Sequence, residues 1–362
     1  MKNLIPAALL LTVALFSCKK GQVKPAPPGV PGANMFLYAG GYAKGGGGYD
    51  SIGIYFKQKL SDGAKGAAVN PVAVQNSRWI MSIVSYDSAM YMTGNAPGYW
   101  KNDSFIAVNN AWQLQYLAVN GNGVYTCGTE SSGQIAYWQN NSEVNLGNTY
   151  NRTVFRYQGF LSTTVTGMAL QGNNVLISGG INFTDEPMSG APANDSRAGV
   201  YEILWTNSTA NFLAHNNYWE AEAFFPHPLG VAVAGNDIYV PGNLPDSAKY
   251  GGYWQNGTWS TINKGNFTPT SAYANGMDVY FTGYTGISGA VNSPPSYAVY
   301  WKNGVLHYLN GLVTNAVTVY NGDVYVLGVD NSGNNVIWKN DNLFATLGPA
   351  ADYNISCIAT GY

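Results

Sequence analysis

Seven carboxylates in loops rich in glycine and asparagine are the side chains best suited to acid–base chemistry. They are Asp50, Glu130, Asp185, Glu186, Asp195, Asp246 and Asp330. Hydrolysis of a glycosidic bond needs two carboxyl groups at a set separation, one of them with a raised pKa. No spacing in the sequence pairs any two of these residues. We therefore interpret them as solvated loop charges, and a carbohydrate-active hydrolase or lyase that uses them is the alternative.

Metal and nucleophile chemistry has little support in the sequence. The three histidines, His215, His227 and His307, are too scattered to form a metal cluster. No Gly-x-Ser-x-Gly elbow marks a nucleophilic serine. The segment Asp330–Asn334 has oxygen ligands at a spacing that calcium tolerates, but such loops are common in turns. We expect no cofactor, with calcium at this loop as the alternative.

Cysteine chemistry is expected only near the N-terminus. The apolar run Leu4–Phe16 is too short to span a bilayer as a permanent helix and is typical of a secretory signal. The residues that end it resemble the lipobox of bacterial lipoproteins, which implies cleavage after Ser17 and lipidation of Cys18. Cys127 and Cys357 lie in apolar strands of separate repeats, and we expect both to be buried free thiols.

The residues after Cys18 predict a tether rather than a fold. Proline stiffens this stretch toward an extended conformation, so residues 1–17 are read as signal peptide and 18–33 as lipidated cysteine plus tether. Basic Lys19 and Lys20 follow the cysteine, where surface-export signals place acidic residues. We expect a lipid anchor in the cell envelope, on the outer membrane facing the periplasm, with surface exposure as the alternative.

The composition indicates an all-β protein and excludes one class of partner. Only 10% of residues are charged and the formal net charge is −2, so no basic stripe is available for nucleic acid. The 44 glycines and 27 tyrosines are typical of a turn-rich β-structure. No sustained stretch has the apolar spacing of an amphipathic helix.

One segment recurs along the chain: a strand, a tight turn, then an apolar-Tyr-apolar-x-Gly strand. Its instances are Phe36–Gly40, Met90–Gly94, Val124–Gly128, Val175–Gly179, Ile238–Gly242, Val279–Gly283 and Val324–Gly328. The turns contain Asn-Gly or Asn-Asp pairs, which accept the positive φ of a two-residue hairpin. Fixed-period self-similarity of this kind is the signature of a repeat fold.

The first instance lacks the partner strand that precedes each of the others. The matching segment is found at the other end of the chain, in Ser356–Tyr362. Such an arrangement makes sense only if the repeats close into a ring, since an open array would begin and end on whole capping repeats. We therefore predict a seven-bladed β-propeller of four-stranded blades over residues 34–362, in which the C-terminal strand joins the N-terminal blade.

A second motif, Tyr-Trp-Lys-Asn or a close variant, follows in most repeats. Examples are Tyr99–Asn102, Tyr300–Asn303 and Ile337–Asn340, whereas the fourth repeat departs from it and carries Gly199–Trp205 at the expected place. Because the tryptophans repeat, we expect them to pack between blades rather than to bind ligand. The two motifs together resemble the repeats of exported bacterial lipoproteins with seven-bladed propellers. No activity comes with that resemblance, and WD40 and kelch signatures are missing.

A binding site is expected on the face that carries the long connections between strands two and three and between blades. Counting back from each tight turn gives the residues that should border the central channel there: Tyr353, Trp79, Gln113, Thr164, His227, Thr268 and Val313. Arg78, Trp112 and Asp352 are next to them in sequence. Aromatic faces with a few polar groups suit sugars or extended peptides.

We therefore expect a membrane-anchored recognition or scaffold module that binds a glycan or protein ligand. The predicted ligand-binding residues are Arg78, Trp79, Trp112, Gln113, His227, Asp352 and Tyr353. The alternative is that these aromatic side chains have only a structural role and fill the mouth of the channel.

Overall fold

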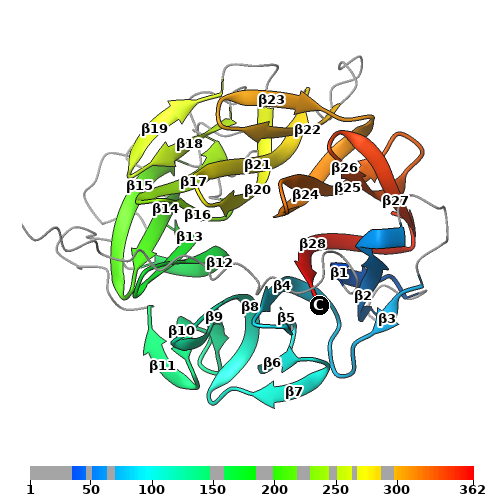
Figure 1. The fold of residues 1–362 in the computed structure, drawn as a ribbon. Coiled ribbons are helices and arrows are strands. Elements are labelled where there is room, and N and C mark those ends of the chain that lie inside the picture. The colour runs from blue at the N-terminus through cyan, green and yellow to red at the C-terminus, as the bar shows by residue number, and fades with distance from the viewer. Residues whose placement is uncertain are drawn as a thin grey trace, which may run out of the picture. The chain divides into compact units, whose positions relative to one another are not determined.

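Four-stranded antiparallel sheets account for almost the whole described chain. The computed structural model describes residues 35–45, 51–62, 70–146, 159–184, 199–217, 229–243, 251–262, 267–286 and 297–362. Within them, seven such sheets follow one another around a ring, each with one strand innermost (Figure 1). The chain is thus a seven-bladed β-propeller, as its repeats predict.

Each blade runs from its innermost to its outermost strand. Blade one comprises β28 (Tyr353–Gly361), β1 (Phe36–Ala43), β2 (Ile52–Lys59) and β3 (Val72–Ala73). Blade two comprises β4 (Ile80–Tyr86), β5 (Ala89–Gly94), β6 (Gly98–Lys101) and β7 (Ser104–Ala107). Blade three comprises β8 (Ala111–Asn120), β9 (Gly123–Glu130), β10 (Ile135–Gln139) and β11 (Ser142–Asn145). Blades four and five comprise β12 (Gly159–Gln171), β13 (Asn174–Thr184), β14 (Gly199–Thr206) and β15 (Thr209–Asn217); and β16 (Ala232–Ala234), β17 (Asp237–Asn243), β18 (Gly251–Gln255) and β19 (Thr258–Thr261). Blades six and seven comprise β20 (Phe267–Asn275), β21 (Asp278–Thr285), β22 (Tyr297–Lys302) and β23 (Val305–Tyr308); and β24 (Gly311–Tyr320), β25 (Asp323–Asp330), β26 (Asn334–Lys339) and β27 (Asn342–Pro349).

The ring closes as predicted, through β28 and β1. These strands pair antiparallel from Phe36↔Gly361 to Ala43↔Tyr353. The Tyr38 hydroxyl donates to the backbone carbonyl of Tyr362 over 3.0 Å. Closure within one sheet leaves no unpaired inner edge between the first and last blades.

The repeated tryptophans fill the spaces between blades, which confirms their predicted role. Trp100, Trp138, Trp254, Trp301 and Trp338 are all buried. Trp338 of blade seven, for example, belongs to a cluster that includes Tyr280, Tyr300 and Leu309 of blade six. Large rings bury the most apolar area per side chain, so these positions stabilise the contact between neighbouring sheets.

Blade four follows the second motif more closely than its sequence suggests. Trp205 pairs with Ile177 in the same register in which Trp338 pairs with Val326. The indole is fully buried against blade three, whose Tyr137 belongs to the same cluster. Leu204–Asn207 is therefore this blade's copy of the motif, with threonine in place of lysine.

The motif asparagine ties the two hairpins of a blade together. In six blades it sits in the turn between the third and fourth strands at a φ between 45° and 55°, and its Oδ1 accepts the backbone N–H that begins the second strand: Asn102 with Met90, Asn140 with Val124, Asn207 with Val175, Asn256 with Ile238, Asn303 with Val279 and Asn340 with Val324. Asparagine tolerates this left-handed conformation better than most residues do. We call this contact the asparagine clamp.

Candidate functional site

In six described blades, the motif glycine brings the second strand against the inner strand at the loop-rich face. A Cβ on Gly94 would overlap the carbonyl oxygen of Trp79, and one on Gly128 would overlap that of Gln113. Only glycine permits this approach, which explains why it recurs. The rim residues defined by this contact are Asn354, Trp79, Gln113, Thr164, Thr268 and Val313.

Blade one corrects one of the expected rim positions. Tyr38 pairs with Lys57 as Tyr91 pairs with Lys101, so the motif glycine of this blade is Gly41 rather than Gly40. The rim residue is then Asn354, not Tyr353. Because side chains alternate along a strand, a shift of one residue moves the side chain to the other face. Tyr353 accordingly packs on the core, with its ring 5.5 Å from that of Phe56 in an edge-on arrangement.

Aromatic side chains of blades one and two meet at the rim. The ring centroids of Tyr42 and Trp79 are 6.1 Å apart, and the rings are tilted by 54°. The Asn354 side-chain amide donates to the Tyr42 hydroxyl over 3.2 Å. Trp79 is half-buried, and its indole N–H is buried with no hydrogen-bond partner among the described residues. This arrangement fixes two aromatic faces beside one amide group.

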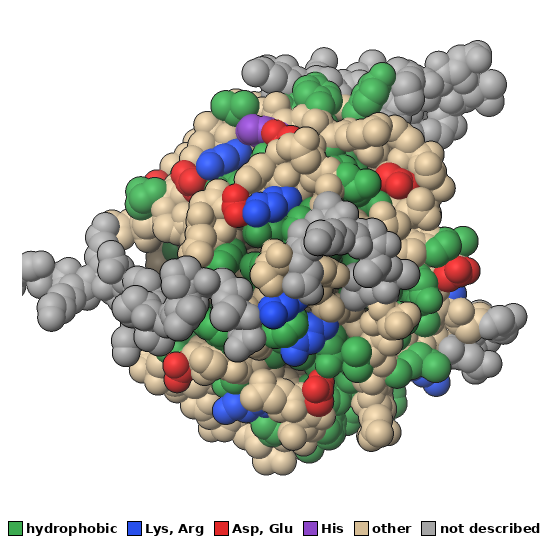
Figure 2. Space-filling view, turned by 45° about the vertical axis from the view of Figure 1, so that its right-hand side comes forward, with side chains coloured by type: hydrophobic (Ala, Val, Ile, Leu, Met, Phe, Trp, Pro, Cys, Tyr) green, Lys and Arg blue, Asp and Glu red, His purple; other side chains and the backbone are tan. Residues whose placement is uncertain are grey.

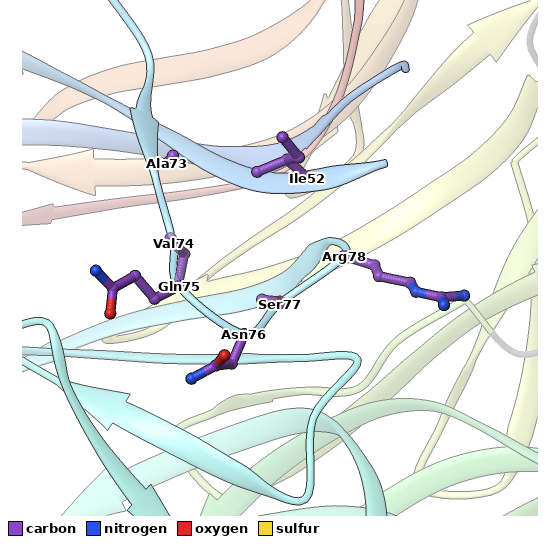
Figure 3. Close-up of a pocket in the computed structure, with 7 residues that line it drawn as sticks. All are labelled: Ile52, Ala73, Val74, Gln75, Asn76, Ser77 and Arg78. Atoms are coloured by element: carbon purple, nitrogen blue, oxygen red, sulfur yellow. The ribbon is translucent and has the colours of Figure 1, made fainter. Parts of the chain in front are cut away.

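A hollow of about 430 Å³ lies next to Trp79, between the start of β2 and the segment that leads from β3 to β4. Its lining residues are Ile52, Ala73, Val74, Gln75, Asn76, Ser77 and Arg78 (Figure 3). The segment is tied to β2, because Gly53 donates to the Ser77 carbonyl and Val74 donates to the Gly53 carbonyl, both over 2.8 Å. Figure 3 shows the Arg78 side chain extending away from Gln75 and Asn76.

Trp112 is the most exposed aromatic ring of this face within the described residues. Its side chain is 69% exposed, at the start of the inner strand of blade three. The neighbouring Gln113 is half-buried, and its amide contacts the sulfur of Met81 in blade two at 3.8 Å. Trp112 holds the same register position in blade three that Arg78 holds in blade two. We call Tyr42, Arg78, Trp79, Trp112 and Asn354 the aromatic rim.

The remaining predicted binding residues are placed differently. Asp352 is exposed, and its backbone carbonyl accepts the N–H of Lys44 at 2.8 Å. His227 and Cys18 lie outside the described residues. Tyr42 and Asn354 are the rim residues that the sequence did not reveal, although the paired glycines at 40 and 41 could have pointed to the correct register.

Only two of the seven loop carboxylates, Glu130 and Asp330, lie within the described residues. Glu130 accepts from Ser132 at 2.7 Å and contacts Glu143, whose pKa is raised first by burial and then by its hydrogen bond with Glu130.

The other described carboxylate is engaged by its own loop. Asp330 accepts the backbone N–H groups of Ser332 and Asn334 at 2.9 and 2.8 Å. Such contacts are those of an ordinary Asx turn. No group of three or more metal-ligating side chains gathers within the described part of the chain.

The two described cysteines are free and buried, as predicted. Burial raises the pKa of the Cys357 thiol to about 12, and burial also raises the pKa of Cys127 well above its usual value. A thiol needs to ionise to act as a nucleophile, so both are inert in this environment.

The face drawn in Figure 2 has no large field of one charge among its described side chains. Figure 2 shows apolar side chains in small groups among uncharged polar atoms, with lysine, arginine and acidic side chains interspersed. Within the described residues, no helix has the length and apolarity that a membrane crossing requires.

Comparison with known proteins supports the fold and goes no further. No protein-family model and no curated protein sequence matches the chain. Among solved structures, the β-propeller domain of the Trilobed protease from Pyrococcus furiosus is similar, with 11% identity over 88% of this chain and 95% of that chain and a TM-score of 0.51. An Aleuria aurantia lectin in complex with Fucα1-6GlcNAc matches with 8% identity over 74% of this chain and 95% of that chain at a TM-score of 0.36. The WD40 domain of Toxoplasma gondii coronin matches with 11% identity over 85% and 81% of the two chains at a TM-score of 0.45. The chain therefore shares the propeller fold with the domain of the Trilobed protease.

Proposed function

We propose that this protein is a recognition or scaffold module of the cell envelope that binds a glycan or peptide at the aromatic rim. The observation that carries the proposal is the exposure of Trp112. In a molecule that buries the tryptophans of its repeats, this one is 69% exposed, on the face that also carries the Tyr42–Trp79 pair. Large exposed aromatic rings with convergent polar groups are typical of ligand sites.

The neighbouring side chains have the chemistry that such a site needs. Tyr42 and Trp79 offer aromatic faces, and Asn354 and Gln113 offer amide groups that both donate and accept hydrogen bonds. The hollow beside Arg78 adds a concave surface. These groups come from the ends of three strands, β1, β8 and β28, and from the short link before β4, all of which the propeller holds in place.

Binding is tested with glycan and peptide arrays probed by the soluble domain and by a Trp112→Ala variant. We expect the variant to lose binding while its melting temperature stays near that of the wild type. Met277→Ala is the matched control, since Met277 is 70% exposed and sits in a tight turn on the opposite face. Retained binding in Trp112→Ala, or equal loss in Met277→Ala, would remove the aromatic rim as the site.

We also propose that Cys18 carries the lipid that anchors the protein to the outer membrane, facing the periplasm. The lipobox-like ending of the apolar run supports this. A Cys18→Ser variant should move from the membrane to the soluble fraction. Wild-type protein that is already soluble would contradict the anchor.

A further inference from the structure

Among the described residues, Arg78 is a cation without a counter-ion. The described ion pairs of lysine are those of Lys302 with Asp278 and Lys339 with Asp323, in blades six and seven. The His307 ring lies 3.2 Å from the Asp341 carboxylate, in the same two blades. Arg78 forms no ion pair within the described chain, is exposed, and lines the hollow next to Trp79. A guanidinium presented in this way can pair with a carboxylate through two parallel hydrogen bonds.

A second cation lies on the same face. Lys44 follows β1, and its ammonium group donates only to the carbonyl of Ala350, over 2.8 Å, among the described contacts. Asp352 is the one described carboxylate on this stretch of the rim. Counted over the described residues alone, two cations and one anion give this part of the face a positive balance, although the whole chain has a formal net charge of −2. The local sign therefore reflects placement and not overall composition.

We propose that the aromatic rim takes an acidic glycan, in which a uronic acid carboxylate pairs with Arg78 while sugar rings stack on Trp79 and Trp112. This proposal rests on the proposed function and names its ligand class. Sugar hydroxyls match the amide groups of Gln75 and Asn76, which line the hollow, and that of Asn354 at the rim, because each can donate or accept.

The geometry favours a glycan over a peptide. Extended peptides are often bound by adding a strand to an unpaired sheet edge. The strands of blades one and two reach this face by their ends, so they present side chains there and no free edge. Stacking on an indole ring, by contrast, needs only an exposed aromatic face, which Trp112 supplies.

The test compares two probes that differ only in charge: an oligogalacturonate and the same oligosaccharide with methyl-esterified carboxyls. A panel of sulfated, neutral and acidic-peptide ligands is measured beside them by calorimetry. We expect wild-type protein to bind the acid at least 10-fold more tightly than the ester. Arg78→Gln should remove that difference, Arg78→Lys should restore part of it, and added salt should weaken binding of the acid alone.

The other outcomes distinguish failure of the acidic-glycan proposal from failure of the proposed binding function. Equal affinity for acid and ester, with Arg78→Gln unchanged and Trp112→Ala defective, sinks the acidic-glycan proposal and leaves the binding function intact. A preference for the sulfated ligand or the acidic peptide overturns the uronic acid assignment in the same way. Absence of binding to every ligand of the panel, or binding that Trp112→Ala does not alter, overturns both this inference and the proposed function.

Discussion

Blade seven and blade one are built from the same repeat but end differently at their outer edges. In blade seven, β26 and β27 form a hairpin whose turn carries the asparagine clamp of Asn340. In blade one, Gln58 holds the equivalent position, its amide reaches only the neighbouring Lys59 carbonyl at 3.3 Å, and the two-residue β3 pairs only with Ile54 and Tyr55. Blade one thus has a two-residue β3 in place of a long fourth strand, and the segment that follows β3 lines the hollow.

The difference separates the residues that build the ring from those available for binding. Every side chain of the two motifs in blade seven is engaged: Tyr325 and Trp338 are buried, and Lys339 pairs with Asp323 at 2.7 Å. In blade one and the start of blade two, the chain departs from the repeat and exposes Ile52, Arg78 and part of Trp79. Departures from the repeat, rather than the repeat itself, mark the candidate site.

The largest expected effect is a difference in unfolding free energy between replacing a buried motif tryptophan, Trp338, and replacing the exposed Trp112. Trp338→Ala should cost about 3–5 kcal/mol of unfolding free energy, because it opens a cavity between blades six and seven. Trp112→Ala should cost less than about 0.5 kcal/mol, as exposed substitutions usually do. Denaturant unfolding of both variants measures the contrast, and similar losses would contradict it.

A second prediction concerns a buried glutamate in blade four. Glu202 in β14 is fully buried, and neither carboxyl oxygen has a hydrogen-bond partner in the described structure. Burial alone raises its pKa from 4.5 to about 8. Between about pH 4.5 and 8, the Glu202 carboxyl is therefore protonated in the folded protein and ionised in the unfolded chain.

The sign of the pH dependence follows from that difference. The contribution of the protonated carboxyl is complete below about pH 4.5 and is lost as the pH rises to about 8. A Glu202→Met variant fills a similar volume without a polar group, so we expect it to gain about 1–3 kcal/mol at pH 7. Between about pH 5 and 9, the melting temperature of this variant should change less with pH than that of the wild type. Parallel curves for the two proteins would show that Glu202 does not titrate in this range.

The smallest effect is expected for the asparagine clamp. Asn340 accepts from Val324 and donates to Asp323 at 2.7 Å, at a φ of 48°. Asn340→Ala should cost about 1–2 kcal/mol, since it loses these bonds and strains the turn. Asn340→Gly retains the backbone conformation, so the difference between the two variants measures the strain. Gln58→Ala in blade one should leave the unfolding free energy almost unchanged. A loss as large as that of Asn340→Ala would show that the asparagine clamp contributes no more to stability than Gln58 does.

The ring, its blade count and its closure could be predicted from the sequence because their signals are local and repeated. Alternating apolar residues and Asn-Gly turns specify each hairpin, and the missing partner of the first strand was supplied by the last. Burial of the motif tryptophans followed from their number alone.

The errors occurred where the repeat is locally ambiguous. Gly40 and Gly41 are adjacent, and both are tightly packed, so either could have been taken as the motif glycine. In blade four, threonine at position 206 hid the motif around Trp205. The burial of Glu202 could not be predicted, because one carboxylate in a strand is normally placed on the solvent side, and only the packing of neighbouring blades decides otherwise.

The pairing of Phe36 with Gly361 has a practical consequence for engineering. In blade seven, Tyr320 and Asp323 are paired in the same way and joined by the two residues Asn321 and Gly322. Met35 and Tyr362 occupy the corresponding places in blade one, so a peptide bond between them would make a hairpin of ordinary length. New termini could then be opened in any tight turn of another blade, which would let a fusion partner or surface attachment point be set at a chosen angle around the molecule.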